Sequence, residues 1–208
     1  MTHVQIIPGD FTITDPDAPR YQLRKTLTSD DFTGTGELAG TLTNAALGGD
    51  PVLWEGATPS GWERLNGALT TTPDLGGAGN LTLPGLVDGA EVEFKVLQLP
   101  GGTGWMYVSL RASPTDRVYV GLRGSGRLTV QQDVGGAGST LASFEGAFTT
   151  GDRIKLGVSG GVVSVWVNGD PLPPQAFTAP TPSYLAFSYY PANGVGALED
   201  LVVTVPTN

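Results

Sequence analysis

The chain of 208 residues contains no cysteine and only one histidine, His3. Without cysteine there is no disulfide framework, no thiolate nucleophile and no cysteine zinc site. A Ser-His-Asp triad and a multi-histidine metal centre are excluded as well, because the single histidine lies in an N-terminal segment that differs from the rest of the chain. The composition therefore excludes cysteine nucleophiles, Ser-His-Asp triads, and zinc sites built from cysteines or several histidines.

Long apolar runs and basic clusters are also missing. No apolar run approaches the roughly 20 residues of a membrane-spanning helix, so we expect no membrane insertion. The formal net charge is -9, and no group of lysines and arginines stands clear of acidic neighbours. Nucleic acid is therefore not an expected partner, because phosphate binding needs a basic footprint. The first residues lack a basic stretch followed by a hydrophobic core, so no classical signal peptide is expected.

A helical period is absent, whereas a strict alternation of period two is present between Glu91 and Asp133. This period is typical of β-strands that turn one face to the core and the other face outward. The side chains expected in the core are Val92, Phe94, Val96, Met106, Val108, Leu110, Val118, Val120 and Leu122. The 31 glycines and 16 prolines lie between the apolar runs, which indicates many turns.

Two Asn-Gly pairs predict tight hairpin turns, Asn66-Gly67 and Asn168-Gly169. About a dozen short strands at regular spacing, with no helix, are typical of a β-sandwich or barrel. Residues 1–28 differ in pattern from the rest of the chain and are interpreted as an extended arm that docks on another protein, or as an extra edge strand. Residues 29–208 are expected to form one domain.

Several segments together resemble the concanavalin A-like lectin/glucanase superfamily in its laminin-G-like form. They cover about residues 29–206 and comprise Asp30-Asp31-Phe32, Gly61–Leu69, Glu91–Phe94, Asp152–Gly169 and Leu198–Val203. The resemblance implies an all-β fold, a jelly roll of two antiparallel sheets, here preceded by the N-terminal arm. Small glycine-rich domains that begin this way are similar to parts of minor tail or head-surface proteins of bacteriophages.

One outward strand face combines aromatic rings with arginines. The candidate carbohydrate-binding residues are Trp105, Tyr107, Arg111, Arg117, Tyr119 and Arg123. Pyranose rings pack their C–H groups on aromatic faces, and guanidinium groups donate to hydroxyls or carboxylates. The same residue types are enriched in protein interfaces, so an assembly contact or burial under the arm, a loop or a neighbouring subunit stays open.

Trp166 and the pair Tyr189-Tyr190 form a second aromatic set. Trp166 is out of phase with the neighbouring valines, so we expect it to face away from the core. It either extends the first aromatic set or covers the other face of the sandwich, unless the loop at 171–182 shields it.

Glu91 and Glu93 are candidates for catalytic carboxylates, because glucanases of this superfamily use a Glu-x-Asp-x-(x)-Glu strand as nucleophile and general acid. Lys95 and Val96 occupy both positions for the last carboxylate, so no enzymatic activity is expected. Calcium stays open as a metal, because the resemblance implies a loop rim at which laminin-G-like domains often bind it. Aspartates do lie at the predicted turns, namely Asp74, Asp88, Asp133, Asp152 and Asp170, but no dense ligand run occurs. We therefore expect no cofactor and assign no metal ligands.

Together these features predict a non-enzymatic virion surface protein, either a phage tail protein or a capsid decoration. Its lectin-like domain would adsorb weakly to host cell-envelope glycans or reinforce the particle, as a monomer or homo-oligomer. The arm would contact other virion proteins. The alternatives are an extracellular bacterial carbohydrate-binding module and a glycoside hydrolase.

Overall fold

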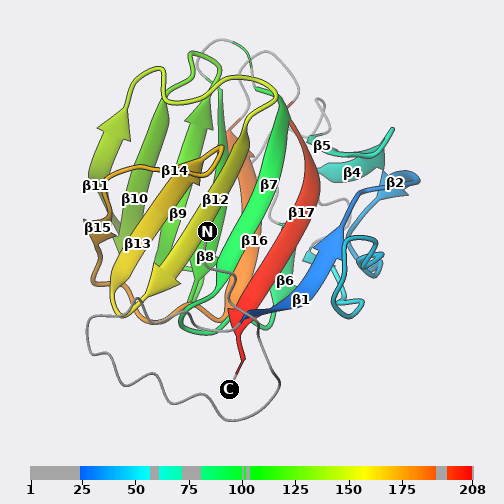
Figure 1. Cartoon of the computed structure of the whole chain (residues 1–208), viewed down its shortest axis with the longest axis horizontal. Coiled ribbons are helices and arrows are strands. Elements are labelled where there is room, and N and C mark those ends of the chain that lie inside the picture. Colours follow the sequence, from blue (N-terminus) through cyan, green and yellow to red (C-terminus); the bar gives the residue numbers. More distant parts are fainter. Residues whose placement is uncertain are drawn as a thin grey trace, which may run out of the picture.

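A computed structural model describes residues 24–56, 61–71, 81–99, 101, 104–190 and 196–207 (Figure 1). The described residues form two packed antiparallel sheets and contain no helix, so the predicted all-β sandwich is confirmed. Accordingly, none of these residues belongs to a helix that could cross a membrane. Residues 1–23, most of the predicted arm, lie outside the described part of the chain.

The larger sheet has ten strands and lies in front in Figure 1. Its main path runs β14-β13-β12-β7-β17-β5-β4-β2, while β1 pairs with β17 and β15 pairs with β13. The bounds are β1 (Arg24–Asp30), β2 (Thr35–Glu37), β4 (Trp62–Leu65), β5 (Ala68–Thr71), β7 (Glu91–Gln98), β12 (Arg153–Ser159), β13 (Val162–Val167), β14 (Asp170–Pro171), β15 (Gln175–Ala176) and β17 (Ala197–Pro206).

The second sheet has seven strands in the order β11-β10-β9-β8-β16-β6-β3. Its members are β3 (Glu55–Gly56), β6 (Leu81–Pro84), β8 (Trp105–Arg111), β9 (Arg117–Arg123), β10 (Leu128–Val134), β11 (Ala137–Phe144) and β16 (Tyr184–Tyr190). The inner faces of both sheets form one hydrophobic core, as expected for sheets packed face to face.

The core contains the apolar residues that alternation predicted. All nine of those side chains, from Val92 to Leu122, are fully buried. Trp54, Trp62 and Phe187 add large aromatic rings to the same core, with ring centroids 5.9 Å apart in both the Trp54–Phe187 and Trp62–Phe187 pairs. Burial of this apolar surface is the main stabilising contribution to the sandwich.

Both predicted Asn-Gly turns are present. Asn66 and Gly67 connect β4 to β5 with φ angles of 55° and 80°, and Asn168 and Gly169 connect β13 to β14 with φ angles of 53° and 89°. Positive φ at both central residues defines the hairpin turn that favours this dipeptide. The local sequence therefore determines the register of both hairpins.

The strands between Glu91 and Asp133 do not share one sheet. β7 pairs with β12 and β17 in the ten-stranded sheet, whereas β8 and β9 pair with each other in the seven-stranded sheet. The outward side chains of β7 consequently point to the opposite side of the molecule from those of β8 and β9. The alternation in the sequence could not reveal this, because a period of two is the same in either sheet.

Residues 24–28, at the end of the predicted arm, belong to β1. This strand pairs with β17 from Arg24 opposite Pro206 to Asp30 opposite Leu201. The chain therefore enters the ten-stranded sheet before residue 29.

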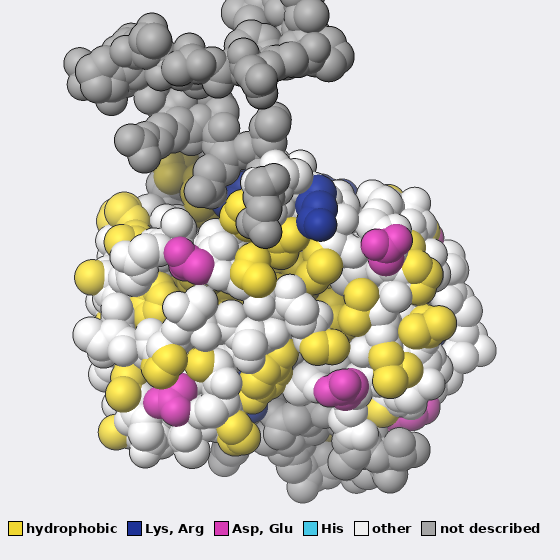
Figure 2. Space-filling model, turned by 90° about the horizontal axis from the view of Figure 1, so that it is seen from below, with side chains coloured by type: hydrophobic (Ala, Val, Ile, Leu, Met, Phe, Trp, Pro, Cys, Tyr) yellow, Lys and Arg dark blue, Asp and Glu magenta, His cyan; other side chains and the backbone are white. Residues whose placement is uncertain are grey.

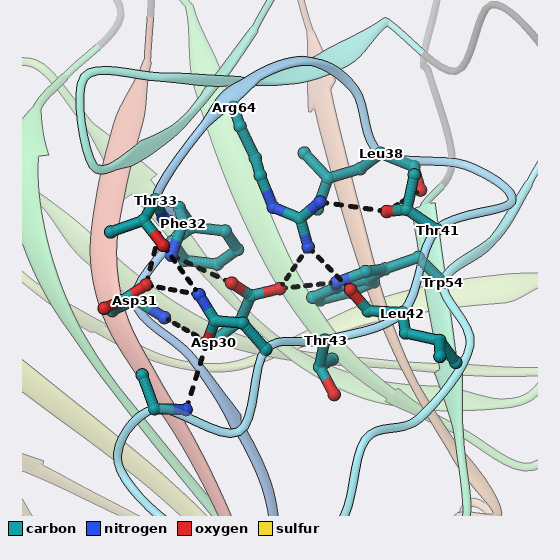
Figure 3. Close-up of polar contacts among 12 residues, drawn as sticks. Asp30, Asp31, Phe32, Thr33, Leu38, Thr41, Leu42, Thr43, Trp54 and Arg64 are labelled. Carbon is teal, nitrogen blue, oxygen red and sulfur yellow. Dashed lines mark hydrogen bonds and ion pairs between the residues drawn. The ribbon is translucent and has the colours of Figure 1, made fainter.

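A buried carboxylate at the end of β1 links this strand to β4 and to the segment before β3 (Figure 3). Asp30 is fully buried, and its Oδ2 accepts hydrogen bonds from Trp54 Nε1 at 2.9 Å and Arg64 Nη2 at 2.8 Å. Its Oδ1 accepts a bond from the backbone N–H of Phe32 at 2.8 Å. A buried charge is tolerated when it is paired and hydrogen-bonded in this way. The Asp30-Asp31-Phe32 segment is thus a structural element of the fold.

Candidate functional site

The six predicted binding residues lie on the outer face of the seven-stranded sheet, on β8 and β9. Cross-strand register places Trp105 opposite Arg123, and Arg111 opposite Arg117. Between these pairs, Tyr107 lies opposite Gly121, and Ser109 lies opposite Tyr119. We call this surface the aromatic–arginine face and define it by the six residues Trp105, Tyr107, Arg111, Arg117, Tyr119 and Arg123.

The three aromatic rings of this face contact one another in sequence. Trp105 and Tyr107 are stacked with centroids 6.0 Å apart and planes at 10°. Tyr107 meets Tyr119 edge to face at 5.7 Å. Gly121 makes room for this arrangement, because a Cβ atom there would lie 3.0 Å from Tyr107 Cε1 and 3.1 Å from Trp105 Cε3. The rings therefore lie across β9, with the glycine beneath them.

Guanidinium groups flank the rings at both ends. Arg117 Cζ lies 4.5 Å from the centroid of the Tyr119 ring, and Arg123 Cζ lies 5.6 Å from that of Trp105. Arg127, between β9 and β10, approaches the Trp105 ring at 6.0 Å. The sequence alone did not single out Arg127, although its position just after the Gly124-Ser125-Gly126 turn places it beside the end of β9. These distances fall within the range of cation–π attraction.

Accessibility divides the six residues into two groups. Trp105, Tyr107, Arg117 and Arg123 are partly exposed. Tyr119 and Arg111 are each only 7% exposed, so neither can present a full surface to a ligand. Burial lowers the pKa of Arg111, and the nearby charge of Arg117 lowers it further.

A hydrogen-bonded group holds the Arg117 end in place. Arg117 Nε lies 2.6 Å from Asp133 Oδ2, and the Tyr119 hydroxyl lies 3.0 Å from Gln131 Oε1 and 3.2 Å from Asp133 Oδ1. Burial, together with the charge of Asp133, raises the pKa of Tyr119 to about 12. Tyr119 is therefore a neutral donor at physiological pH, and the contact with Asp133 holds Arg117 at the rim.

The second aromatic set does not form one site. Trp166 lies on β13, on the outer face of the ten-stranded sheet, opposite the aromatic–arginine face. Tyr189 is buried and packs edge to face on Trp62 at 5.5 Å. The side chain of Tyr190 lies outside the described part of the structure.

Glu91 and Glu93 also lie on the outer face of the ten-stranded sheet. Glu91 contacts Arg24 at 3.0 Å and Lys155 at 3.5 Å, and Glu93 contacts Arg153 at 3.5 Å. The structure thus separates these carboxylates from the aromatic–arginine face by the whole thickness of the sandwich.

The predicted turn aspartates are dispersed. Asp88 accepts the backbone N–H of Gly160 at 3.2 Å, and Asp152 accepts a bond from Asn168 Nδ2 at 2.7 Å, while Asp133 contacts Arg117. Asp170 lies in the short strand β14, and Asp74 lies outside the described residues. Among the residues described, no three His, Cys, Asp or Glu side chains are grouped so as to hold a metal ion.

Comparison with known proteins places the fold. No family model matches the chain, and no curated protein is similar to it in sequence. Among solved structures, the endo-β-1,3-glucanase of Pyrococcus furiosus superposes with a TM-score of 0.62 at 9% identity, over 90% of this chain and 96% of the other. The catalytic domain of a laminarinase, an endo-1,3-β-glucanase of Thermotoga petrophila, gives 0.59 at 10% identity, over 90% and 100%. The carbohydrate-binding module CBM66 of Bacillus subtilis gives 0.50 at 10% identity, over 83% and 96%.

These similarities correct the expectation that the protein has no enzymatic activity. That expectation depended on the sequence after Glu91, which lacks a glucanase carboxylate pattern. β7, however, lies on the opposite side of the molecule from the aromatic–arginine face, so its sequence does not test for catalysis there. Endo-β-1,3-glucanases have this fold, so the fold gives no ground for excluding hydrolysis. At identities of about 10%, what the comparisons show for this chain is the concanavalin A-like jelly roll that the resemblance implied.

Proposed function

We propose that this domain binds a glycan on the aromatic–arginine face. The observation that carries the proposal is the stacked, partly exposed pair of Trp105 and Tyr107, which lies across Gly121 with arginines at both ends. The apolar faces of sugar rings pack on such aromatic surfaces, while guanidinium groups donate to ring hydroxyls. The fold shared with a carbohydrate-binding module and with glucanases supports the same class of ligand.

The roles of the six residues follow from their accessibility. Trp105 and Tyr107 would contact the sugar ring, and Arg117 and Arg123 would donate hydrogen bonds at its edges. Tyr119 is buried and would hold Tyr107 and Arg117 in position through its ring contacts with both, while Arg111 is buried and would make little contact with the ligand. A short face of this kind binds weakly, and several copies on one support would raise the apparent affinity.

Titration of the purified protein with laminarihexaose, cellohexaose and a glycan array tests the proposal. We expect saturable binding that Trp105→Ala and Tyr107→Ala each reduce at least about tenfold, equivalent to about 1.4 kcal/mol. Leu65→Ala, at an exposed hydrophobic residue on β4 of the other sheet, is the matched control and should bind normally. Binding that survives both aromatic substitutions would move the site elsewhere.

We further propose that the domain is displayed on a virion surface and attached through its N-terminal arm. The support is the resemblance to phage tail and head-surface domains and the distinct sequence of residues 1–28. A chain lacking residues 1–23 retains every described strand, so it should still bind glycan but no longer join the particle. Normal incorporation of the shortened chain would contradict attachment through the arm.

Hydrolysis of a glycan is the second candidate function, favoured by the TM-scores of 0.59 and 0.62 to endo-β-1,3-glucanases. Carboxylates near the aromatic–arginine face include Asp133, Asp116 in the loop before β9, and Glu145, which pairs with Arg127 at 3.0 Å. A hydrogen bond from the backbone N–H of Gly135 lowers the pKa of Asp116, so this group is ionised at neutral pH.

Release of reducing ends from laminarin is the measurement that tests hydrolysis. If this face is catalytic, Asp116→Asn or Asp133→Asn should abolish the release, and Glu63→Gln, on β4 of the other sheet and outside both proposed binding faces, should leave it unchanged. The absence of product with folded protein would exclude hydrolysis of this polysaccharide.

A further inference from the structure

Trp166 is positioned on the ten-stranded sheet in the same way as Trp105 on the other sheet. It is partly exposed, and its ring extends over Gly157 of β12. A Cβ atom at Gly157 would lie 3.3 Å from Trp166 Cζ3 and 3.0 Å from Glu91 Cγ. As on the other sheet, a glycine on the neighbouring strand makes room for a tryptophan that lies outside the core.

Two hollows meet at this ring. One, of about 250 Å³, is lined by Trp166, Gly157 and Ser164 together with the Glu91–Arg24 ion pair. The other, of about 380 Å³, is lined by Trp166, Lys155, Arg153, Glu93 and Asn168. The tryptophan therefore forms a wall common to both, and each hollow combines an apolar ring surface with several polar groups. One aromatic ring among several hydrogen-bonding groups suits a sugar, which presents an apolar ring face and many hydroxyls.

Charges around the two hollows are balanced. The carboxylates of Glu91, Glu93 and Asp200 face the cations of Arg24, Lys155 and Arg153, with the closest contact at 2.6 Å between Arg153 and Asp200. Lys155 Nζ also lies 4.4 Å from the centroid of the Trp166 ring. Because neither sign is in excess, the surface favours a neutral, hydroxyl-bearing ligand over a uronate or a polycation.

We propose that the Trp166 surface is a second binding site, for a neutral oligosaccharide about two rings long. One sugar ring would pack on Trp166 in the smaller hollow, and the next would accept and donate hydrogen bonds in the larger one. This site extends the proposed glycan binding to a second, opposite face. It does not depend on residues of the aromatic–arginine face.

The four tryptophans of the chain permit a direct test, because Trp54 and Trp62 are fully buried while Trp105 and Trp166 lie on opposite sheets. Protein labelled with 5-fluorotryptophan should give four fluorine resonances, which Trp105→Phe and Trp166→Phe assign. The probes are laminarihexaose, cellohexaose, xylohexaose and chitohexaose, with trigalacturonate as the acidic comparison. We expect at least one neutral probe to shift the Trp166 resonance in a saturable manner, also in the Trp105→Phe protein.

The outcomes separate this inference from the proposed function. A shift at Trp105 alone would overturn the second site and leave the first in place, whereas a shift at Trp166 alone would do the reverse. No shift at either ring with any probe would overturn both. A stronger response at Trp166 to trigalacturonate than to the neutral probes would overturn the assigned ligand class. The resonances of Trp54 and Trp62 should stay fixed and serve as the internal control for an intact fold.

Discussion

Asp30 illustrates how one buried carboxylate can organise the end of the core where β1 ends. Its carboxylate is shared by Trp54, Arg64 and the backbone of Phe32, which come from three separate parts of the chain. Phe32 has a φ of 56°, a left-handed conformation that is uncommon outside glycine and that this hydrogen bond helps to hold. The residue therefore fixes the path of the chain where β1 ends.

Asp30→Ala should be strongly destabilising, because it leaves the Arg64 guanidinium and the Trp54 indole N–H without their shared acceptor. We expect a loss of about 3–5 kcal/mol in the free energy of unfolding, measured by urea denaturation. Asp31→Ala is the matched control, because Asp31 is only partly buried and bonds Thr33 and Asn44 near the surface, and it should cost about 1 kcal/mol. Equal losses of unfolding free energy in the two variants would contradict a specific stabilising role for the buried Asp30 carboxylate.

Tyr119 should ionise only at strongly alkaline pH, because burial and the nearby Asp133 charge raise its pKa to about 12. Because the folded-state pKa is raised above the unfolded value, the associated stability is fully present below about pH 10 and is lost as the pH rises toward 12. The phenolate absorbance of the wild type minus that of Tyr119→Phe should therefore report a transition near pH 12. Asp133→Asn should move this transition downward, and an unchanged midpoint would mean that the Asp133 charge does not contribute.

At the scale of strands, the sequence predicted the elements better than their partners. Alternation identified β7, β8 and β9 and every core side chain on them, and the Asn-Gly pairs located two hairpins. It could not tell that the chain crosses between sheets after β7, because that crossing is decided by tertiary packing. Alternation also could not predict the burial of Tyr119, because that burial depends on contacts with the neighbouring side chains of Tyr107 and Arg117.

The sequence did not predict a role for Gly121 or Gly157, the glycines under the two tryptophans, because both lie in strands with ordinary alternation. Gly121→Ala should disturb the aromatic–arginine face, since the added methyl group would lie 2.7 Å from Thr129 Oγ1 and about 3 Å from two rings. We expect a stability loss of about 1–3 kcal/mol and loss of glycan contact at Trp105, measured by urea denaturation and by the fluorine resonance.

Gly157→Ala is the matched control on the other sheet. It should change the Trp166 resonance and leave Trp105 unaffected, with a smaller stability loss, because its nearest neighbour is the flexible side chain of Glu91. If both substitutions altered both tryptophans, the two faces would not be independent.

At the scale of the whole molecule, the aromatic–arginine face and the Trp166 surface lie on opposite outer faces of the sandwich. The end of the sandwich where β1 begins carries few charged side chains and many apolar and uncharged ones (Figure 2). A third hollow of about 400 Å³ lies at this end, lined in part by Leu27, Val87 and Val205. With a glycan site on each of these faces, as proposed, one domain would be bivalent.

Bivalency predicts that the monomeric protein cross-links glycan-coated beads, using whichever neutral oligosaccharide binds both faces. Trp105→Ala and Trp166→Ala should each abolish cross-linking while single beads still retain protein, because one face remains. The double variant should lose bead binding altogether.

Sedimentation at the working concentration serves as the control for mass, since a homo-oligomer would cross-link through one face per copy. Beads that still aggregate with either single variant of a proven monomer would contradict two independent sites. Loss of all retention by one substitution would assign the binding to that face alone.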